Sequence, residues 1–411
     1  MVLSIVDIPK EKLYQKKVLV RVDFNVPMRD GQVQNDQRIR AALPTLRYLQ
    51  AQEATIILMS HLGRPKGEVK ESLRLAPVGE YLSQLLEVPV IALQDTVGDT
   101  VKARIAEAQP GDGTIFLLEN TRFYAEETQN DAGFAKQMAE LADVYVNDAF
   151  GAAHRAHAST AGVADYLPAY AGCLLKKEIE ALQQLTQSPE HPFAAVIGGA
   201  KVSSKLGVLE QLLPKVDVLV VGGAMAYTFL AAQGIPVMNS LVEPELYDTA
   251  RQLMDAAKQH DTQLILPIDT VLAQSVDAED ATVTVVLSEV SDEKLPDLQD
   301  LTGVDIGSLS IDAMGKALEN CNTLLWNGPM GVFENPAFCH GTEAVARMIA
   351  DRTKAGALTV VGGGDSVAAV EKLELADSFS HVSTGGGASL EFLEGKTLPG
   401  IAALSQSVAQ V

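Results

Sequence analysis

Four apolar runs in the first half of the chain each end in charged or amide side chains. They are VLVRVDFNVP (Val18–Pro27), TIILMSHLGRP (Thr55–Pro65), TIFLLENTRF (Thr114–Phe123) and VYVNDAFGAAHR (Val144–Arg155). Each run is typical of a buried strand that leads into a polar loop. In open α/β sheets, ligands bind beyond the carboxyl ends of the strands. Guanidinium groups match carboxylate and phosphate oxygens, so the first half predicts a site for a ligand with more than one negative charge.

The candidate cations lie at or just after these strand ends, except one that begins a helix. They are Arg21, Arg38, His61, Arg64, Arg122, His154, Arg155 and His157. Asp23 and Asn25 occupy alternate positions, so they point to the same side and would bind hydroxyl groups or orient arginines. Taken singly, each arginine could equally form a surface salt bridge and each histidine a satisfied polar contact. A shared anion site explains the whole set better, with His154 and His157 as its weakest members.

The second half ends similar strands in glycines. GGAKVSSK follows the strand FAAVI and is predicted to open a helix, which would direct backbone amides and Lys201 at a phosphate. It lacks the spacing of a Walker A motif, and no run here is a GxGxxG. GGGDS repeats the turn with Asp365 placed to hold Mg²⁺ between phosphate oxygens, and GGGAS is a third such turn. Together they predict a site for a nucleoside di- or triphosphate.

Other features near these turns have competing explanations. Gly222 and Gly223, taken alone, are better explained as a tight turn or a helix-packing contact. The sole tryptophan, Trp326, is predicted to pack in the core, while Asn327 and Glu334 in the same segment could bind a ribose or a base.

Strand-like runs alternate with helical patterns along the chain, which predicts an α/β fold with parallel sheets. The predicted helices are Arg38–Glu53, Leu75–Leu86, Asp131–Ala142, Val202–Leu213, Pro244–Gln259 and Gly341–Lys354. The favoured domain boundary lies within Leu174–Pro192, where SPEHP ends a segment with helical spacing. This segment could also be one more surface helix of a single sheet. Val276–Asp305 is predicted to form a β excursion inside the second domain.

Bulk properties exclude several classes of protein. A chain of 411 residues favours two domains, and a net charge of −21 argues against binding nucleic acid or an anionic membrane. The first residues do not resemble a signal peptide, so the expected location is cytoplasmic. Val218–Met238 carries no charge, but its glycines and proline favour a strand, turn and helix over a membrane span. Three cysteines without CxxC spacing fit reduced thiols.

The motifs together resemble the phosphoglycerate kinase family, in that family's order and spacing from near the N-terminus to the end. They are RVDFNVP, SHLGRP, ENTRF, NDAFGAAHRAHAST, GGAKVSSK, WNGPMGVFE, GGGDS and STGGGAS. The resemblance implies two Rossmann-like domains with parallel β-sheets flanked by helices, facing each other across a hinged cleft. It implies reversible phosphoryl transfer from 1,3-bisphosphoglycerate to ADP, giving 3-phosphoglycerate and ATP with Mg²⁺, by a monomer. One departure is visible, because the phosphate turn reads GGDS where GGDT is more usual; the hydroxyl is kept.

The resemblance also implies roles for parts of the chain. Residues 1–174 would bind phosphoglycerate, 175–190 would form an interdomain helix and hinge, 191–395 would bind nucleotide, and 396–411 would pack back on the first domain. Arg38 and Lys201 would be catalytic, clamping the transferring group. The implied phosphoglycerate ligands are Asp23, Phe24, Asn25, Arg38, His61, Leu62, Gly63, Arg64, Arg122 and Arg155. The implied nucleotide ligands are Lys201, Lys205, Gly303, Asn327, Glu334, Gly363, Gly364, Asp365 and Ser366, with Asp365 on the metal and Gly385, Gly386 and Gly387 as backbone donors in the transition state.

Two other functions use related architectures. A dehydrogenase would need a dinucleotide fingerprint and an acidic ribose ligand at the next strand, and GGAKVSSK supplies neither. A noncatalytic binding protein for phosphorylated metabolites would explain the arginines and the hinge. It would not need Lys201, Asp365 and a second phosphate site.

Overall fold

The computed structural model describes residues 2–109, 111–291 and 293–407. The chain forms two compact units. Unit 1 contains the residues up to Glu180 together with those from Thr397 onward, and unit 2 contains Ala181–Lys396. The division falls inside one helix, α6 (Cys173–Gln187), where the sequence predicts a helix.

Unit 1 is built on a six-stranded parallel sheet with the order β5-β6-β4-β1-β7-β8. Its strands are β1 (Lys17–Val22), β4 (Thr55–Met59), β5 (Val90–Ala92), β6 (Ile115–Leu117), β7 (Val144–Asp148) and β8 (Ala169–Ala171). The four runs singled out in the sequence are β1, β4, β6 and β7, which are neighbours in this sheet. Their registers pair Arg21 with Met59 and Val22 with Asp148, so the polar loops leave the sheet at one edge.

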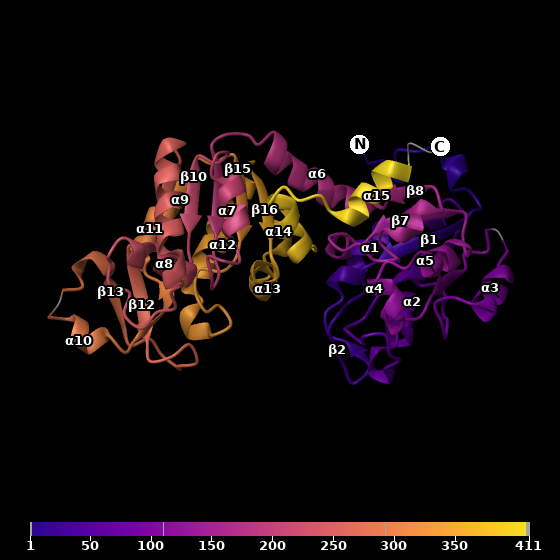
Figure 1. Cartoon of the computed structure of the whole chain (residues 1–411), viewed down its shortest axis with the longest axis horizontal. Helices are drawn as coiled ribbons and strands as arrows, with labels where there is room; N and C mark the ends of the chain where they lie inside the picture. The colour runs from indigo at the N-terminus through magenta and orange to yellow at the C-terminus, as the bar shows by residue number, and fades with distance from the viewer. Residues whose placement is uncertain (1, 110, 292, 408–411) are drawn as a thin grey trace. The chain divides into compact units, whose positions relative to one another are not determined.

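Helices flank this sheet because apolar residues recur on one face of each. They are α1 (Gln37–Gln50), α2 (Ala76–Leu86), α3 (Asp99–Ala106), α4 (Ala125–Thr128), α5 (Ala132–Ala139), α6 and α15 (Pro399–Ser407), with a small hairpin of β2 (Met28–Arg29) and β3 (Gln32–Val33). The late helix α15 packs against β8 of unit 1 (Figure 1), and the Gly400 amide donates to the Ala153 carbonyl at 2.8 Å.

Unit 2 has its own six-stranded parallel sheet, ordered β11-β10-β9-β15-β16-β17. Its strands are β9 (Phe193–Ile197), β10 (Val218–Val221), β11 (Gln263–Ile265), β15 (Thr323–Asn327), β16 (Leu358–Gly362) and β17 (His381–Val382). Glycines follow β9, β10, β15, β16 and β17 at the same edge, as the sequence predicts. Trp326 on β15 is fully buried in the core, so its predicted packing role is confirmed.

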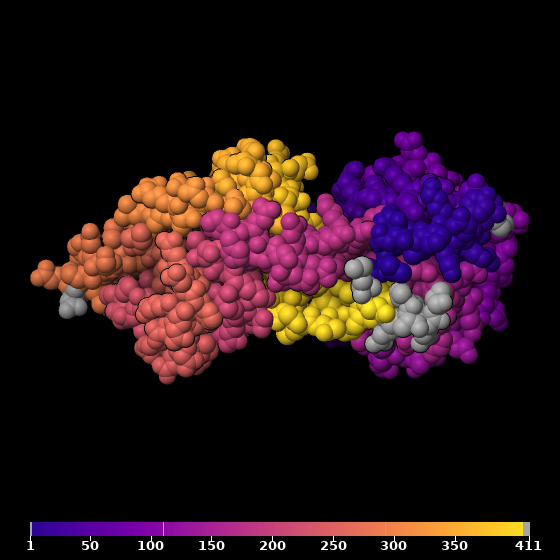
Figure 2. All heavy atoms as spheres, turned by 90° about the horizontal axis from the view of Figure 1, so that it is seen from above, coloured from indigo at the N-terminus to yellow at the C-terminus, as the bar shows by residue number. Residues whose placement is uncertain are grey.

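A three-stranded antiparallel sheet interrupts the parallel pattern of unit 2. Its order is β13-β12-β14, with β12 (Asp269–Ala273), β13 (Val283–Val286) and β14 (Thr302–Ile306). The predicted β excursion is confirmed, although it starts earlier than Val276 because β12 belongs to it. Figure 2 shows the orange residues of β13 and α10 (Leu295–Leu298) at one end of unit 2.

The helices of unit 2 largely match the sequence pattern. They are α7 (Leu206–Leu212), α8 (Met225–Ala232), α9 (Tyr247–Gln259), α10, α11 (Ser308–Leu318), α12 (His340–Lys354), α13 (Gly364–Lys372) and α14 (Gly387–Leu393). The prediction of a helix from Val202 is wrong, because α7 begins four residues later and residues 202–205 form turns. Short 3₁₀ helices complete the chain: η1 (Lys10–Lys12), η2 (Glu71–Leu73), η3 (Thr121–Phe123), η4 (Phe150–Ala152), η5 (Gly162–Asp165), η6 (Pro244–Leu246), η7 (Leu287–Glu289), η8 (Pro336–Phe338) and η9 (Ala376–Ser378).

The uncharged segment Val218–Met238 contains β10, a glycine turn and α8, as the sequence favours. Among the described residues, no helix has both the length and the apolar character that crossing a membrane requires.

Candidate functional site

Hydrogen bonds tie together the loops that leave β1, β4 and β6 in unit 1. The Phe24 amide donates to Ser60 Oγ at 2.9 Å, and the Gly63 amide donates to Asn25 Oδ1 at 2.8 Å. The Leu62 amide donates to Asn120 Oδ1 at 3.2 Å. The side chains of Phe24 and Leu62 are buried, so these two predicted ligand residues present only backbone to a ligand.

Arg38 lies at the start of α1 and reaches the loop after β1. Its Nη1 donates to Asp23 Oδ2 and to the Asn25 carbonyl, each at 3.1 Å. The side chain is 35% exposed, so part of the guanidinium remains open to solvent. Asp23 therefore orients Arg38 and leaves donors free for a ligand, as the alternate spacing of Asp23 and Asn25 predicts.

Arg122 lies in η3, after β6, and its Nη1 donates to the Gly63 carbonyl at 2.9 Å. Its Nε is buried and has no hydrogen-bond partner in the structure. Burial, together with the charges of Arg21 and Arg155, lowers the pKa of Arg122 to about 10. A buried donor without a partner among like charges is poised for an anion, which would satisfy the donor and offset the repulsion.

The guanidinium of Arg21 is hydrogen-bonded within the protein, which corrects the expectation that it faces the anion site directly. Its side chain is fully buried. Its Nε donates to Ser159 Oγ at 2.9 Å, its Nη1 to the Val22 carbonyl, and its Nη2 contacts His61 Nδ1 at 2.9 Å. Arg21 therefore lies beneath the site and supports His61.

The remaining cations lie around this cluster. Arg64 and Arg155 are exposed, and Arg155 Nε donates to His154 Nε2 at 3.0 Å. Burial, together with the charges of Arg122, Arg21 and Arg155, lowers the pKa of His157 to about 4. Burial and the surrounding arginines likewise hold the pKa of His61 well below its usual range. The cluster is strongly positive even with both of these histidines neutral.

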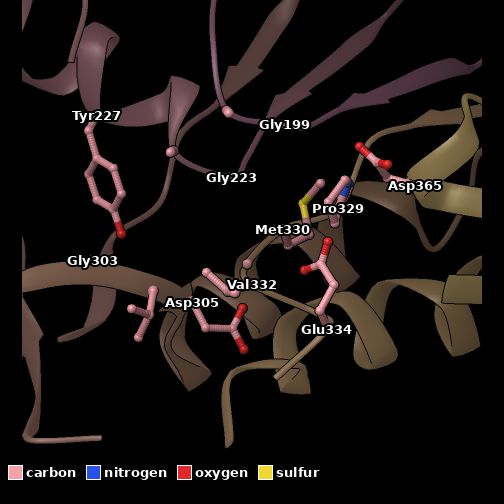
Figure 3. Close-up of a pocket in the computed structure, with 14 residues that line it drawn as sticks. Gly199, Gly223, Tyr227, Gly303, Asp305, Pro329, Met330, Val332, Glu334 and Asp365 are labelled. Carbon is pink, nitrogen blue, oxygen red and sulfur yellow. The ribbon is translucent and has the colours of Figure 1, made fainter. Parts of the chain in front are cut away.

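Unit 2 contains a pocket of about 200 Å³ at the glycine-rich edge of its parallel sheet (Figure 3). Its lining includes three residues that the sequence assigns to a nucleotide, namely Gly303, Glu334 and Asp365. Tyr227 and Gly303 lie at one side of the pocket, and the carboxylates of Glu334 and Asp365 lie at the other. The pocket is therefore acidic at the end formed by Glu334 and Asp365, and Asp305 adds a third carboxyl group to its lining.

Close backbone contacts between glycine turns shape this pocket. A Cβ on Gly328 would lie 2.1 Å from the Gly198 carbonyl oxygen, and Gly328 has φ +105°. A Cβ on Gly223, which has φ +66°, would lie 2.6 Å from the Gly199 amide nitrogen. The favoured explanation of Gly223 as a tight turn or packing contact is incomplete, because Gly223 also lines the pocket. Glycine is required where the turns touch.

Beside the pocket, polar groups converge on the turn that opens α13. Asn327 is buried; its Oδ1 accepts from Lys205 Nζ, and its Nδ2 has no hydrogen-bond partner in the structure. That Nδ2 lies 3.1 Å from where a Gly363 Cβ would be. Ser366 Oγ accepts from the Gly328 amide. Gly364 and Asp365 are the first exposed residues of α13, so this helix presents free amides at its N-terminus.

Lys201 is exposed and does not lie at the start of a helix, which corrects the sequence expectation. It belongs to an irregular loop before α7, which Glu243 holds: Ser203 N and Ser203 Oγ both donate to this carboxylate, at 3.1 and 2.5 Å. Lys205 lies immediately before α7 instead. Gly385 and Gly386 precede α14, and Gly387 begins it.

The acidic end of the pocket fits a metal ion that takes most of its ligands from phosphate. No cluster of three metal-binding side chains exists among the described residues. The exposed carboxylate of Asp365 lies at a helix N-terminus that suits phosphate, and Mg²⁺ commonly uses one or two carboxylates plus phosphate oxygens. Asp365 is therefore the residue that would hold a nucleotide-bound Mg²⁺.

Several residues of these sites carry no recognisable sequence signal. Tyr227, whose hydroxyl contacts Thr270 Oγ1, and Asp305 line the pocket but lie in ordinary helix and strand patterns. Burial raises the pKa of Asp305 to about 6. Glu127 and Ser159, beneath the cation cluster, also escaped prediction. Among the lining residues that were missed, Pro329, Met330 and Gly331 lie in WNGPMG, whose glycine spacing could have indicated them.

A cationic site on one parallel sheet and a phosphate-suited pocket on another define a two-unit phosphotransferase. Family comparison agrees, since the phosphoglycerate kinase model matches residues 8–396. The chain is 54% identical to the phosphoglycerate kinase of Synechococcus elongatus over 95% of this chain and 96% of that one. It is 55% identical to that of Moorella thermoacetica over 96% and 98%. The chain belongs to the phosphoglycerate kinase family, and it is a kinase that transfers phosphate to or from a carboxyl group.

Solved structures resemble the whole chain. The phosphoglycerate kinase of Coxiella burnetii aligns with a TM-score of 0.86 and 43% identity, covering 99% of both chains. That of Pyrococcus horikoshii aligns with a TM-score of 0.81 and 32% identity, covering 100% of both. The expected α/β fold with parallel sheets is confirmed.

Proposed function

We propose that this chain catalyses reversible, Mg²⁺-dependent phosphoryl transfer from 1,3-bisphosphoglycerate to ADP, giving 3-phosphoglycerate and ATP in glycolysis, gluconeogenesis or carbon fixation. The observation that carries the proposal is the contrast between its two sites. Unit 1 offers a cluster of arginines with the unpartnered Nε of Arg122, and unit 2 offers glycine turns with Asp365. These features suit a small phosphorylated acid and a nucleoside phosphate, respectively.

In unit 1, the phosphorylated acid takes its charge-neutralising contacts from Arg38, Arg64, Arg122 and Arg155. Asp23 and Asn25 orient Arg38 and bind the hydroxyl group, because both lie within the same hydrogen-bonded loop. His61 donates to an acid oxygen, and the backbone of Phe24, Leu62 and Gly63 closes the site. Burial and the charges of Arg21 and Arg155 lower the pKa of Arg122, and an anion here would relieve the repulsion among these arginines.

In unit 2, the base lies at the Tyr227 and Gly303 end of the pocket and the phosphates lie toward Asp365. Glu334 binds the ribose hydroxyls, since its carboxylate faces the middle of the pocket. Asn327 Nδ2, Ser366 and the amides of Gly363 and Gly364 hold phosphate oxygens with Lys205. Asp365 would hold the nucleotide-bound Mg²⁺, which would supply positive charge against the phosphates.

The chemistry needs alignment and charge neutralisation more than acid–base catalysis. An acyl phosphate is already activated, so the bond from its acyl oxygen to phosphorus breaks as a β-phosphate oxygen of ADP bonds to that phosphorus. The carboxylate departs without needing a proton. Arg38 and Lys201 clamp the three equatorial oxygens from opposite units, and the amides of Gly385, Gly386 and Gly387 donate to them.

Two ligands bound on separate units must be brought together, and water must be kept from the phosphoryl group. We therefore include hinge closure about residues 175–190 in the proposal, with residues 396–411 serving as a second connection to the first domain. Small-angle scattering should show a smaller radius of gyration with both ligands than with either one. Equal radii in all states would remove hinge closure from the mechanism.

The proposal includes a cytoplasmic monomer, with no nucleic-acid or membrane partner, in agreement with the charge of −21. Its first test is ATP formation from Mg-ADP and enzymatically generated 1,3-bisphosphoglycerate. Turnover that depends on both substrates and on Mg²⁺ would support the kinase reaction. A folded protein that binds both ligands without turnover would instead indicate a noncatalytic binding protein.

A further inference from the structure

A buried contact between Arg21 and His61 determines where the imidazole proton lies. Arg21 Nη2 is 2.9 Å from His61 Nδ1, and both side chains are buried. A guanidinium has donors and no acceptor, so Nδ1 must accept this hydrogen bond with its lone pair. A neutral imidazole then carries its single proton on Nε2.

Arg21 is itself held rigidly. Its Nε donates to Ser159 Oγ at 2.9 Å, and Ser159 Oγ in turn donates to Glu127 Oε1 at 2.5 Å. Glu127 Oε2 accepts from the Ser159 amide at 2.9 Å, and Glu127 is fully buried. The buried carboxylate thus compensates the buried guanidinium through one hydroxyl group, which fixes the direction in which Nη2 points.

His61 Nε2 has no acceptor among the residues that the structure describes, and the nearest carboxylate approaches the other nitrogen. Asp23 Oδ1 lies 4.0 Å from Nδ1, which is too long for a hydrogen bond. Burial, followed by the charges of Arg21, Arg122, Arg38 and His157, keeps the pKa of His61 well below its usual range. The imidazole is therefore neutral, with one free N–H.

We propose that Arg21 is a positioning residue that holds His61 as its Nε2–H tautomer, so that a neutral histidine presents a hydrogen-bond donor to the anionic ligand of unit 1. The opposite tautomer would direct a lone pair at the ligand and repel its oxygens. Guanidinium charges surround the site already, so a donor without added charge binds the anion without increasing their repulsion. The inference rests on the proposed function only in naming 3-phosphoglycerate as the ligand.

The tautomer is measured directly by ¹⁵N NMR of histidine-labelled protein, because protonated and bare imidazole nitrogens have well-separated chemical shifts. The His61 signals are assigned from their loss in His61→Gln. The expected spectrum of the free wild-type protein at neutral pH has a bare Nδ1 and a protonated Nε2. A protonated Nδ1, alone or together with a protonated Nε2, would overturn the proposal whatever the activity of the enzyme.

Arg21→Lys tests whether Arg21 is the cause. Lysine carries one ammonium nitrogen and lacks the forked guanidinium, so it cannot donate to Ser159, Val22 and His61 together. We therefore expect a mixture of His61 tautomers. Loss of a hydrogen bond to a charged ligand should weaken 3-phosphoglycerate binding about tenfold or more by calorimetry, with Mg-ADP binding unchanged. In steady-state kinetics, Arg21→Lys should raise the KM for 3-phosphoglycerate more than it lowers kcat. Arg47→Lys, an exposed change on α1, is the matched control.

The outcomes separate the inference from the proposed function. A fully retained Nε2–H tautomer in folded Arg21→Lys would show that Arg21 is not its cause. A mixed tautomer with unchanged 3-phosphoglycerate affinity would keep the role of Arg21 and remove His61 from the ligand set. If Arg21→Lys does not fold by circular dichroism, the comparison of His61→Gln with His61→Asn decides. Gln places a donor near Nε2 and should retain more affinity than Asn, and equal affinities would contradict the proposal.

Discussion

The two units are suited to anions by opposite means. Unit 1 uses side chains: burial and the charges of neighbouring arginines lower the pKa values of Arg122, His61 and His157. Unit 2 uses the main chain: the glycine turns after β9, β10 and β15 approach so closely that a Cβ on Gly198, Gly223 or Gly328 would collide with backbone. In unit 1, an anionic ligand would relieve repulsion between cationic side chains. In unit 2, close packing of the main chain sets the shape of the site.

This contrast has consequences for how each unit responds to change. Side-chain sites respond to pH and to salt, because their energies depend on charge. Main-chain sites are insensitive to pH but intolerant of added atoms, because their turns cannot move independently. Four perturbations test the contrast, and they are ordered by the size of the expected effect.

The largest effect is expected from removing the proposed clamp. Arg38→Ala and Lys201→Ala should each lower kcat by about 10³-fold or more, with smaller changes in KM, because cationic stabilisation acts mainly on the transferring group. Steady-state kinetics in both directions provide the measurement. Equal losses of kcat in the two variants would show that each unit contributes one cation to the transition state, although their binding sites differ.

Controls for the clamp lie on the same units. Arg40 is exposed on α1 and forms a salt bridge with Asp36, and Lys258 is exposed on α9 and forms one with Asp255. Arg40→Ala and Lys258→Ala should leave kcat within about twofold, since neither lies in a site. Full activity in Lys201→Ala would remove Lys201 from the mechanism and leave the exposed loop after β9 without a catalytic role.

The second perturbation breaks the shape of unit 2. Gly328→Ala adds a Cβ 2.1 Å from the Gly198 carbonyl at φ +105°, so we expect a loss of unfolding free energy of about 3 kcal/mol or more. Trp326 is two residues away and is the only tryptophan, so its fluorescence in urea follows unit 2. Mg-ADP affinity should fall as the turn shifts.

Gly234→Ala is the matched control for that variant. Gly234 also has positive φ, +80°, but a Cβ there would meet nothing within 4 Å. Its expected loss is about 1 kcal/mol, the intrinsic cost of the left-handed conformation. Similar losses in the two variants would mean that conformation, and not close backbone approach, makes the turns of unit 2 require glycine.

Local patterns in the sequence predict most of the fold, because strand and glycine signals are short-range. The helices over 75–86 and 341–354 match α2 and α12 to within one residue. The pattern fails at Val202, where apolar periodicity continues backward into a turn that Glu243 stabilises from 40 positions away. A hydrogen bond so distant in sequence leaves no local signal.

The candidate sites show the same limit. Arg38, Gly303, Glu334 and Asp365 could be placed from motifs, and the structure brings the last three to one pocket. Arg21 could not be distinguished from its neighbours in sequence, because its burial depends on the sheet order β4-β1-β7 and on Ser159. Residue type indicates the chemistry, while topology decides which member of a set meets the ligand.

The third perturbation concerns acid stability in unit 1. His157 has a pKa of about 4 in the folded protein, so below its usual value of 6.5 the unfolded chain binds a proton that the folded chain does not. The contribution of His157 to stability is full above pH 6.5 and falls by about 3 kcal/mol as the pH drops to 4. His61 adds to the loss with the same sign. His157→Gln should therefore flatten the pH dependence.

Amide hydrogen exchange of β1 and β7 at pH 7 and pH 5 measures this effect in unit 1. Trp326 fluorescence serves as the internal control, because unit 2 has no comparable cluster of buried histidines among its described residues. An unchanged slope in His157→Gln would show that the cation cluster relaxes on acidification, and the proposed electrostatic difference between the units would then be smaller than the structure implies.

The smallest expected effect comes from a buried carboxylate of unit 1 outside the cation cluster. Asp148 ends β7, and its Oδ1 accepts from the Leu174 and Leu175 amides of α6, at 2.9 and 3.2 Å. Its Oδ2 is buried without a hydrogen-bond partner in the structure, and burial raises the pKa of Asp148 to about 6. The folded state therefore favours the protonated form of Asp148. The stability that this form contributes is lost as the pH rises through 6.

Asp148→Asn keeps an oxygen for both α6 amides and removes the charge. We expect the variant to be more stable than wild type by about 1 kcal/mol at pH 8, with the difference vanishing near pH 4. Hydrogen exchange of β7 measures it, and Asp143→Asn, an exposed change before the same strand, should show no such dependence. A variant less stable than wild type at pH 8 would mean that attraction between the carboxylate and the amides of α6 exceeds the desolvation of the charge. In that case unit 1 would use main-chain amides at a helix N-terminus to hold a negative charge, as unit 2 is proposed to do, and the contrast between the units would apply only to their ligand sites.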